Sequence, residues 1–109
     1  MSKEYDKLIR DRVPEILDAQ DIKYIITYAR PQDMEHYLYK KLDEEVQELK
    51  QDKDIHEVID VIEVCLAIAK YIGYTNEQLQ DILLRKRDIM GGLSNVILKR
   101  ILGEWYYDV

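Results

Sequence analysis

The chain has 109 residues, of which 47% are hydrophobic and 35% are charged, with 4 glycines and 2 prolines. A chain of this length and composition forms about one soluble globular domain, and so few glycines and prolines argue against disorder and long loops. The net charge of −6, from 22 acidic and 16 basic residues, excludes a general attraction to DNA or RNA but leaves small phosphorylated ligands open.

The start of the chain, MSKEYDKLIRDR, has no apolar signal region, and no apolar run approaches the roughly 20 residues of a membrane helix. The single cysteine, Cys65, lies in an apolar run and is expected to be a small buried side chain, because it has no second cysteine to pair with. We therefore expect an unprocessed cytoplasmic protein with no membrane partner.

The first predicted elements are a short helix and a strand. Pro14 suits the first turn of a helix, where its missing N–H does no harm. Residues 22–29, IKYIITYA, are rich in β-branched and aromatic side chains and end before Pro31, which predicts a strand. The sequence offers no obvious partner strand.

Three longer helices are predicted from apolar spacings of three and four residues and from end signals. Their ranges are about 33–51, 54–71 and 75–90. Gly73 stops the second helix, Thr75–Gln78 has the form of a capping box, and Gly91–Gly92 ends the third. Residues 94–109 fit either a helix or an extended tail. The predicted fold is an all-α helical bundle with one short N-terminal strand.

Several carboxylates fall where apolar side chains are expected. The first long helix has an apolar arc formed by Met34, Leu38, Leu42, Val46 and Leu49. At about 100° per residue, Glu45 falls inside this arc and Glu48 on its margin, whereas Glu44 points away. On the second helix, apolar residues cover more than half of the circumference, so that this helix is expected to be largely buried. Glu57 and Asp60 lie on one face at the edge of its apolar sector.

A cation lies on the apolar face of the third helix. Lys86 is three or four residues from Ile82, Leu83 and Met90. Buried carboxylates without compensation are costly, and Mg²⁺ or Mn²⁺ would compensate them with oxygen coordination. A lysine directed toward such a site would complement a polyphosphate. The alternatives are a snorkelling Lys86 and solvated glutamates, which is the expectation for Glu44 and for Glu63.

Three motifs in order resemble a known family. Glu45-x-x-Glu48 followed by Glu57-x-x-Asp60 resembles the ExxE…ExxD metal signature of MazG-like nucleoside triphosphate pyrophosphohydrolases, in the all-α NTP pyrophosphatase superfamily. The opening KLIRDRVPEIL is similar to the KLVRDKIPEII start of a small single-domain branch. The segment LLRKRDIMGGL resembles the KxxKRGGF element after the third helix, with Leu93 in place of the usual phenylalanine. The similarity covers most of the chain and implies one MazG-like domain over residues 1–109.

The resemblance implies Mg²⁺-dependent hydrolysis between the α and β phosphates of a nucleotide, giving a nucleoside monophosphate and pyrophosphate. It implies that Glu45, Glu48, Glu57 and Asp60 are the metal ligands, with Glu44 as the doubled first acid. Mn²⁺ is the alternative metal.

Further roles follow for the remaining site residues. Glu48, on the margin of the apolar arc, is our candidate for the carboxylate that takes a proton from the attacking water. Lys86 resembles the family's phosphate-facing lysine, and with Arg85 it would stabilise charge on the leaving pyrophosphate. Tyr37 is a candidate for stacking on the base, as is Trp105. Arg10 and Arg12 would either reach phosphate or form surface ion pairs.

Two other functions stay open. One is a non-catalytic helical module that senses nucleotides or mediates interactions, which would need no complete metal set. The other is phosphoribosyl-ATP pyrophosphohydrolase, whose members share the acids but do not usually begin with KLIRDRVPE. Whichever of these functions the protein has, we expect a homodimer or a higher homo-oligomer, because the core is small and the predicted strand is an exposed edge.

Overall fold

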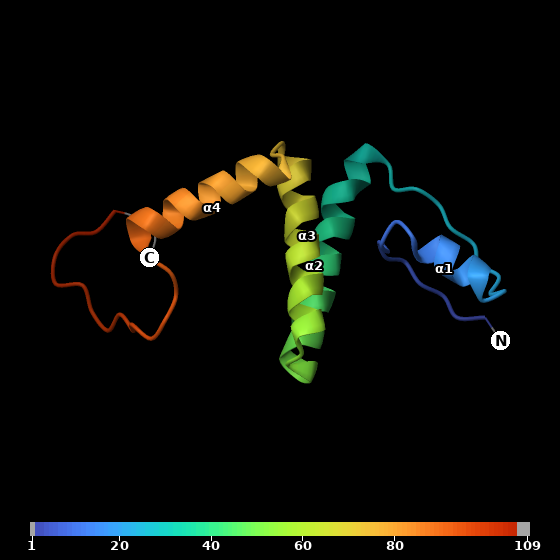
Figure 1. The fold of residues 1–109 in the computed structure, drawn as a ribbon, viewed down its shortest axis with the longest axis horizontal. Coiled ribbons are helices and arrows are strands. Elements are labelled where there is room, and N and C mark those ends of the chain that lie inside the picture. The colour runs from blue at the N-terminus through green and yellow to red at the C-terminus, as the bar shows by residue number, and fades with distance from the viewer. Residues whose placement is uncertain (1, 107–109) are drawn as a thin grey trace. The chain divides into compact units, whose positions relative to one another are not determined.

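A computed structural model describes residues 2–106. The chain divides into two compact units, Met1–Asn76 and Glu77–Val109, and each is described by itself. The first unit contains the helices α1 (Val13–Ala19), α2 (Met34–Asp52) and α3 (Ile55–Ile72) and the short 3₁₀ helix η1 (Pro31–Asp33) (Figure 1). The second unit contains α4 (Asn76–Met90) apart from its first residue, followed by the C-terminal segment. All regular structure in residues 2–106 is therefore helical, as the all-α prediction requires.

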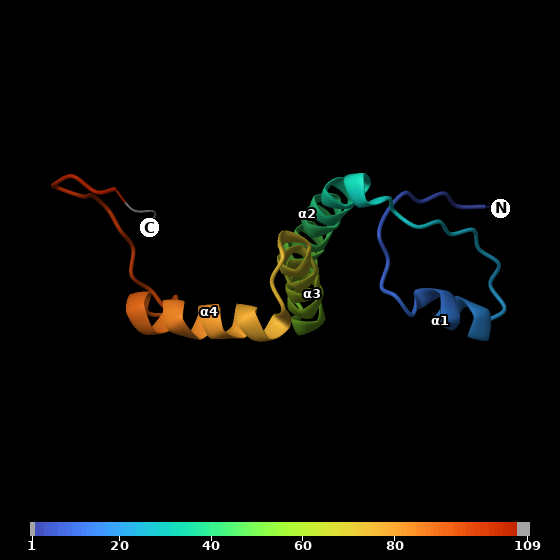
Figure 2. The ribbon, with the colours of Figure 1, turned by 90° about the horizontal axis from the view of Figure 1, so that it is seen from above.

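The two long helices of the first unit form a hairpin. At the end of α2, Lys53 adopts a left-handed conformation with φ 51°, and its N–H donates to the carbonyl of Leu49 at 2.9 Å. The next residue, Asp54, caps α3 by accepting a hydrogen bond from the backbone N–H of His56 at 2.9 Å. Because the link is so short, α2 and α3 run side by side in opposite directions in both views (Figures 1 and 2).

The core lies between these two helices and is small. Among the described residues, the only buried apolar side chains are Leu38 on α2 and Val64 on α3, and the only buried charged residue is Glu45. The predicted helix ranges are confirmed within one residue at each end of α2 and α3. The α2–α3 hairpin is therefore the frame on which any site in this unit is built.

The prediction that α3 is largely buried is wrong. Ile55, Ile59 and Ile62 lie on one stripe of α3 and are 65%, 49% and 47% exposed. Cys65 is also exposed, contrary to expectation. The reason is that α2 covers only the side of α3 that carries Val64, whereas a helical pattern alone does not say how many sides are covered.

The predicted strand at residues 22–29 is also wrong. Within residues 2–106 no strand is present, and residues 22–30 form an irregular connection from α1 to η1. A strand exists only when a second strand accepts its hydrogen bonds, and nothing in the described chain pairs with this segment. Its side chains are accordingly exposed, with Ile25 at 100%.

The second unit consists of one helix and an irregular segment. Helix α4 ends before Gly91, which has φ 82° and donates its N–H to the carbonyl of Arg87 at 2.7 Å. No residue of α4 is buried. Residues 91–106 form neither helix nor strand, which excludes the helical alternative over 94–106, while residues 107–109 of that predicted tail lie outside the described residues. Across residues 2–106, no helix has both the length and the apolarity needed to cross a bilayer.

Candidate metal centre

The α2–α3 hairpin brings five carboxylates together. Oxygens of Glu44, Glu45 and Glu48 lie within 4.8 Å of one another, and so do oxygens of Glu45, Glu57 and Asp60. Glu45 belongs to both groups and therefore joins them. We call these five residues the acid cluster. It forms because residues three apart share a helix face, and the two faces meet across the hairpin.

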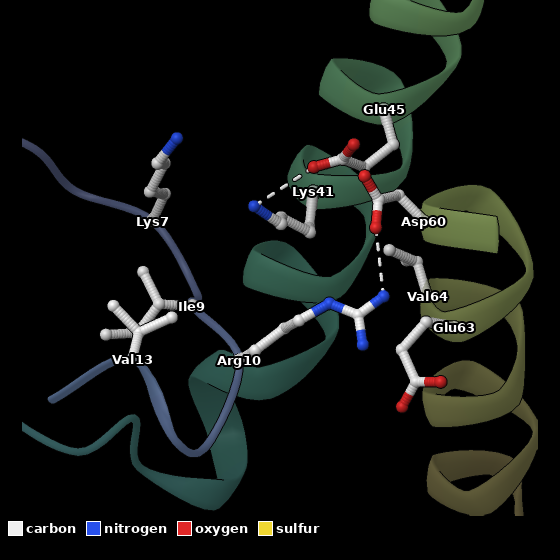
Figure 3. Close-up of a pocket in the computed structure, with 9 residues that line it drawn as sticks. All are labelled: Lys7, Ile9, Arg10, Val13, Lys41, Glu45, Asp60, Glu63 and Val64. Atoms are coloured by element: carbon white, nitrogen blue, oxygen red, sulfur yellow. Dashed lines mark hydrogen bonds and ion pairs between the residues drawn. The ribbon is translucent and has the colours of Figure 1, made fainter. Parts of the chain in front are cut away.

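Glu45 is the most buried member of the acid cluster. It is 5% exposed, less than its apolar neighbours Leu42 and Val46, as its place in the apolar arc of α2 predicts. Its Oε1 lies 3.2 Å from the Nζ of Lys41, one turn earlier on α2. In Figure 3 the carboxylates of Glu45 and Asp60 approach each other from the two helices.

Two oxygens of the acid cluster are buried without a hydrogen-bond partner. They are Oε2 of Glu45 and Oε2 of Glu57. A buried carboxylate oxygen without a donor loses its solvation and gains nothing in return. Carboxylate oxygens in this number are also the ligands that Mg²⁺ and Mn²⁺ prefer. The acid cluster is thus chemically suited to a divalent cation, with Glu45, Glu48, Glu57 and Asp60 as the predicted ligands.

Burial and mutual repulsion also raise the pKa values of two carboxylates in the acid cluster. Burial, followed by repulsion from Glu45, raises the pKa of Glu48 above its usual 4.5. Burial, followed by repulsion from Glu48, raises the pKa of Glu57. Both shifts favour the neutral form of the carboxyl, and a bound cation would act against both.

Glu44, which was expected to be solvated, is 28% exposed and forms an ion pair. Its Oε1 accepts a hydrogen bond from the Nζ of Lys7 at 2.7 Å, and this contact lowers the pKa of Glu44 and raises that of Lys7. The cause is the N-terminal segment, residues 2–12, which lies over this side of α2. Glu63, by contrast, is exposed as expected.

A hollow of about 260 Å³ is lined by residues of the N-terminal segment and of the acid cluster. We call it the α2–α3 hollow. Its charged lining residues are three cations, Lys7, Arg10 and Lys41, and three carboxylates, Glu45, Asp60 and Glu63 (Figure 3). Arg10 donates from Nη2 to Oδ1 of Asp60 at 2.9 Å. Arg12 instead pairs with Glu15 on α1 at 3.3 Å, and it does not line the hollow.

The other predicted substrate contacts belong to other parts of the chain. Tyr37 is on α2, two turns or about 12 Å before Glu45, and its hydroxyl donates to Oδ1 of Asp6 at 2.6 Å. Lys86 and Arg85 are exposed on α4, in the second unit, and Trp105 is 56% exposed in the C-terminal segment. Their roles toward a nucleotide stay predictions.

Sequence reasoning named Arg10 as a residue that reaches phosphate or forms a surface ion pair, but it missed Lys7, Lys41 and the partner of Arg10. Lys41 was detectable, because a lysine four residues before Glu45 lies on the same helix face. The contacts of Lys7 and Arg10 join residues that are 37 and 50 positions apart in the chain, so no local pattern indicates them.

Comparisons of the chain with protein-family models, with curated proteins and with solved structures found no match.

Proposed function

We propose that the acid cluster holds Mg²⁺ or Mn²⁺ and that the protein is a nucleoside triphosphate pyrophosphohydrolase, which cleaves between the α and β phosphates. The observation that carries this proposal is the buried Glu45, whose Oε2 has no hydrogen-bond partner and which lies with Glu57 and Asp60. A purely structural helix pair gains nothing from a carboxylate in that position, because an apolar side chain would pack there at no electrostatic cost.

The proposed roles divide among the residues of the acid cluster. Glu45, Glu48, Glu57 and Asp60 would hold the metal. When bound, the metal would neutralise phosphate charge and lower the pKa of a water molecule. Glu48, on the margin of the apolar arc of α2, would take the proton from that water with a carboxylate oxygen that the metal does not occupy.

Cations and an aromatic side chain would complete substrate binding. Lys86 and Arg85 on α4 would contact the leaving pyrophosphate, since an ammonium and a guanidinium stabilise developing phosphate charge. Tyr37 would stack on the base. The role of Lys86 rests on the resemblance of the chain to MazG-like enzymes, that of Arg85 on its place beside Lys86, and that of Tyr37 on its place on the same side of α2 as Glu48.

We further propose that the working form is a homodimer or a higher homo-oligomer. The stripe formed by Ile55, Ile59 and Ile62 faces away from the side of α3 that carries Glu57 and Val64, because these positions are about half a turn apart. A second copy covering this stripe would enlarge a core that holds only two buried apolar side chains in the described chain. The carboxylates on the opposite side of α3 would stay accessible.

One observation favours a second candidate, a non-catalytic nucleotide-sensing or interaction module. Lys7, Arg10 and Lys41 already pair with Glu44, Asp60 and Glu45, so part of the acidic charge is neutralised without any metal. This network leaves the Oε2 atoms of Glu45 and Glu57 without partners, and for that reason we rank the enzyme first.

A substrate screen separates these functions. Ribo- and deoxyribonucleoside triphosphates and phosphoribosyl-ATP are incubated with the protein and Mg²⁺, and pyrophosphate and orthophosphate are measured separately. We expect pyrophosphate and a nucleoside monophosphate, with release abolished by a chelator. Orthophosphate as the first product would contradict the proposed bond cleavage. Binding of Mn²⁺ and nucleotide without any hydrolysis would favour the sensing module.

A further inference from the structure

Arg10 connects the N-terminal segment to the acid cluster. Its guanidinium lines the α2–α3 hollow and contacts Oδ1 of Asp60, one of the proposed metal ligands. The Arg10 side chain is 52% exposed and that of Asp60 is 37% exposed. An ion pair this exposed is weak, worth at most a few-fold in an equilibrium constant, so it exchanges readily for a better partner.

The N-terminal segment has anchors that do not involve the acid cluster. The hydroxyl of Tyr37 donates to the side chain of Asp6, and Nζ of Lys40 donates to the backbone carbonyl of Asp6 at 2.6 Å. Release of Arg10 from Asp60 would therefore leave the segment in place beside the hollow.

A divalent cation on Asp60 would change the partner that Arg10 prefers. The cation would neutralise the carboxylate and repel the guanidinium at close range. Phosphate oxygens bound to the same cation would bring new negative charge into the hollow. A guanidinium binds such oxygens with two parallel N–H donors, which is a stronger contact than its single bond to Asp60.

We propose that Arg10 is a phosphate-binding residue that exchanges partners: it pairs with Asp60 in the metal-free protein and binds the pyrophosphate group of a metal-bound nucleotide in the loaded protein. This inference rests on the proposed function. It assigns Arg10 of the N-terminal segment to the site. Arg10 would compete with a metal ion that binds alone and would strengthen the binding of a metal ion that carries phosphate.

Arg10→Gln tests the exchange, with Arg12→Gln as the matched control. Arg12 lies two residues away, is the same residue type, and pairs only with Glu15 at the surface among the contacts of the described chain. Mn²⁺ affinity is measured first, by electron paramagnetic resonance without phosphate. Arg10→Gln should bind Mn²⁺ up to about fivefold more tightly than the unmodified protein, because the competing cation is gone. Arg12→Gln should leave the affinity unchanged.

Inorganic pyrophosphate is the second probe, because every nucleoside triphosphate would yield it whatever its base. Its affinity at a fixed Mg²⁺ concentration is measured by calorimetry. Arg10→Gln should bind it roughly tenfold more weakly, which is the loss of one charge-assisted contact. The two effects of the substitution therefore have opposite signs.

Each other outcome overturns the exchange. Weaker binding of both probes would make Arg10 a structural residue, and tighter binding of both would make it only a competitor of the metal. Equal affinities of Arg10→Gln and Arg12→Gln for both probes would mean that Arg10 is not part of the site. In that case, release of pyrophosphate from a nucleotide by the unmodified protein would still uphold the proposed function. Absence of Mn²⁺ binding by the unmodified protein would overturn both.

Discussion

Lys41 and Glu45 lie one helical turn apart on α2, and the ammonium of Lys41 reaches Oε1 of Glu45 at 3.2 Å while Oε2 has no partner. The pair is nearly buried, with side-chain exposures of 18% and 7%. The side chains of the protein therefore compensate only one oxygen of this buried carboxylate, and a bound cation would compensate the other.

Lys41→Met should destabilise the metal-free protein, because it leaves the carboxylate of Glu45 buried with no cation. The expected loss is about 1–3 kcal/mol in the free energy of unfolding. Saturating Mg²⁺ should restore part of this loss. Denaturant unfolding with and without Mg²⁺ measures both effects, and Lys50→Met, at an exposed position of the same helix, is the control. A Lys41→Met protein as stable as the control would contradict the compensation of the Glu45 carboxylate by Lys41.

The pH dependence of stability follows from Glu48 and Glu57. Their pKa values in the folded chain lie above the usual 4.5, so the folded chain binds protons there that the unfolded chain does not. The stabilisation is therefore complete below pH 4.5 and is lost as the pH rises through the raised pKa values. Glu44 acts oppositely, since its lowered pKa contributes stability that is lost only as the pH falls below 4.5.

In a chelator, the melting temperature should therefore rise as the pH is lowered from about 7 toward 5. In Mg²⁺ the added stabilisation by the metal should shrink over the same range, because protons compete for the same carboxylates. The double variant Glu48→Gln, Glu57→Gln should lose both trends. A melting temperature that falls on acidification in the chelator would contradict the raised pKa values.

Lys86→Met should preserve folding and reduce kcat/KM for a nucleoside triphosphate roughly tenfold, because one charge-assisted phosphate contact is removed. The folded state should tolerate the change because Lys86 is exposed on α4. Arg87→Met, the next residue on the same helix, is the control. Equal kinetics for the two variants would leave Lys86 without a role in the reaction.

Ile59→Glu should disrupt self-association, because it places a charge in the centre of the exposed stripe of α3. Light scattering should give a smaller mass for this variant than for His56→Glu, which changes the same helix outside the stripe. A monomeric unmodified protein at micromolar concentration would contradict the assembly.

The sequence predicted where the helices begin and end. It did not predict which of their faces other parts of the chain cover. The bounds of α2 and α3 follow from apolar spacing and from end signals such as Gly73, and the burial of Glu45 follows from its place near Leu38 on the helix face. These are local properties. The strand at 22–29 failed because extended propensity does not supply a partner, and the burial of α3 failed because covering its outer stripe requires more than α2.

The same limit applies to the candidate site. Spacing along α2 and α3 was enough to bring Glu45, Glu48, Glu57 and Asp60 near one another. It was not enough to predict that Lys7 binds Glu44, because that contact depends on the path of the N-terminal segment. The contacts that Lys7 and Arg10 make with the acid cluster are therefore visible only in three dimensions.

Pyrophosphate release by Glu45→Gln and Glu44→Gln tests the central claim most directly. The two residues are neighbours with the same chemistry, but Glu45 is buried with an unpartnered oxygen and Glu44 is half-exposed and bound to Lys7. Glutamine keeps the size of the side chain and removes a charged ligand, so Glu45→Gln should lose activity by orders of magnitude and remain at least as stable in chelator. Glu44→Gln should lose much less activity. A fully active Glu45→Gln protein, or equal losses in the two variants, would contradict a metal centre built on Glu45.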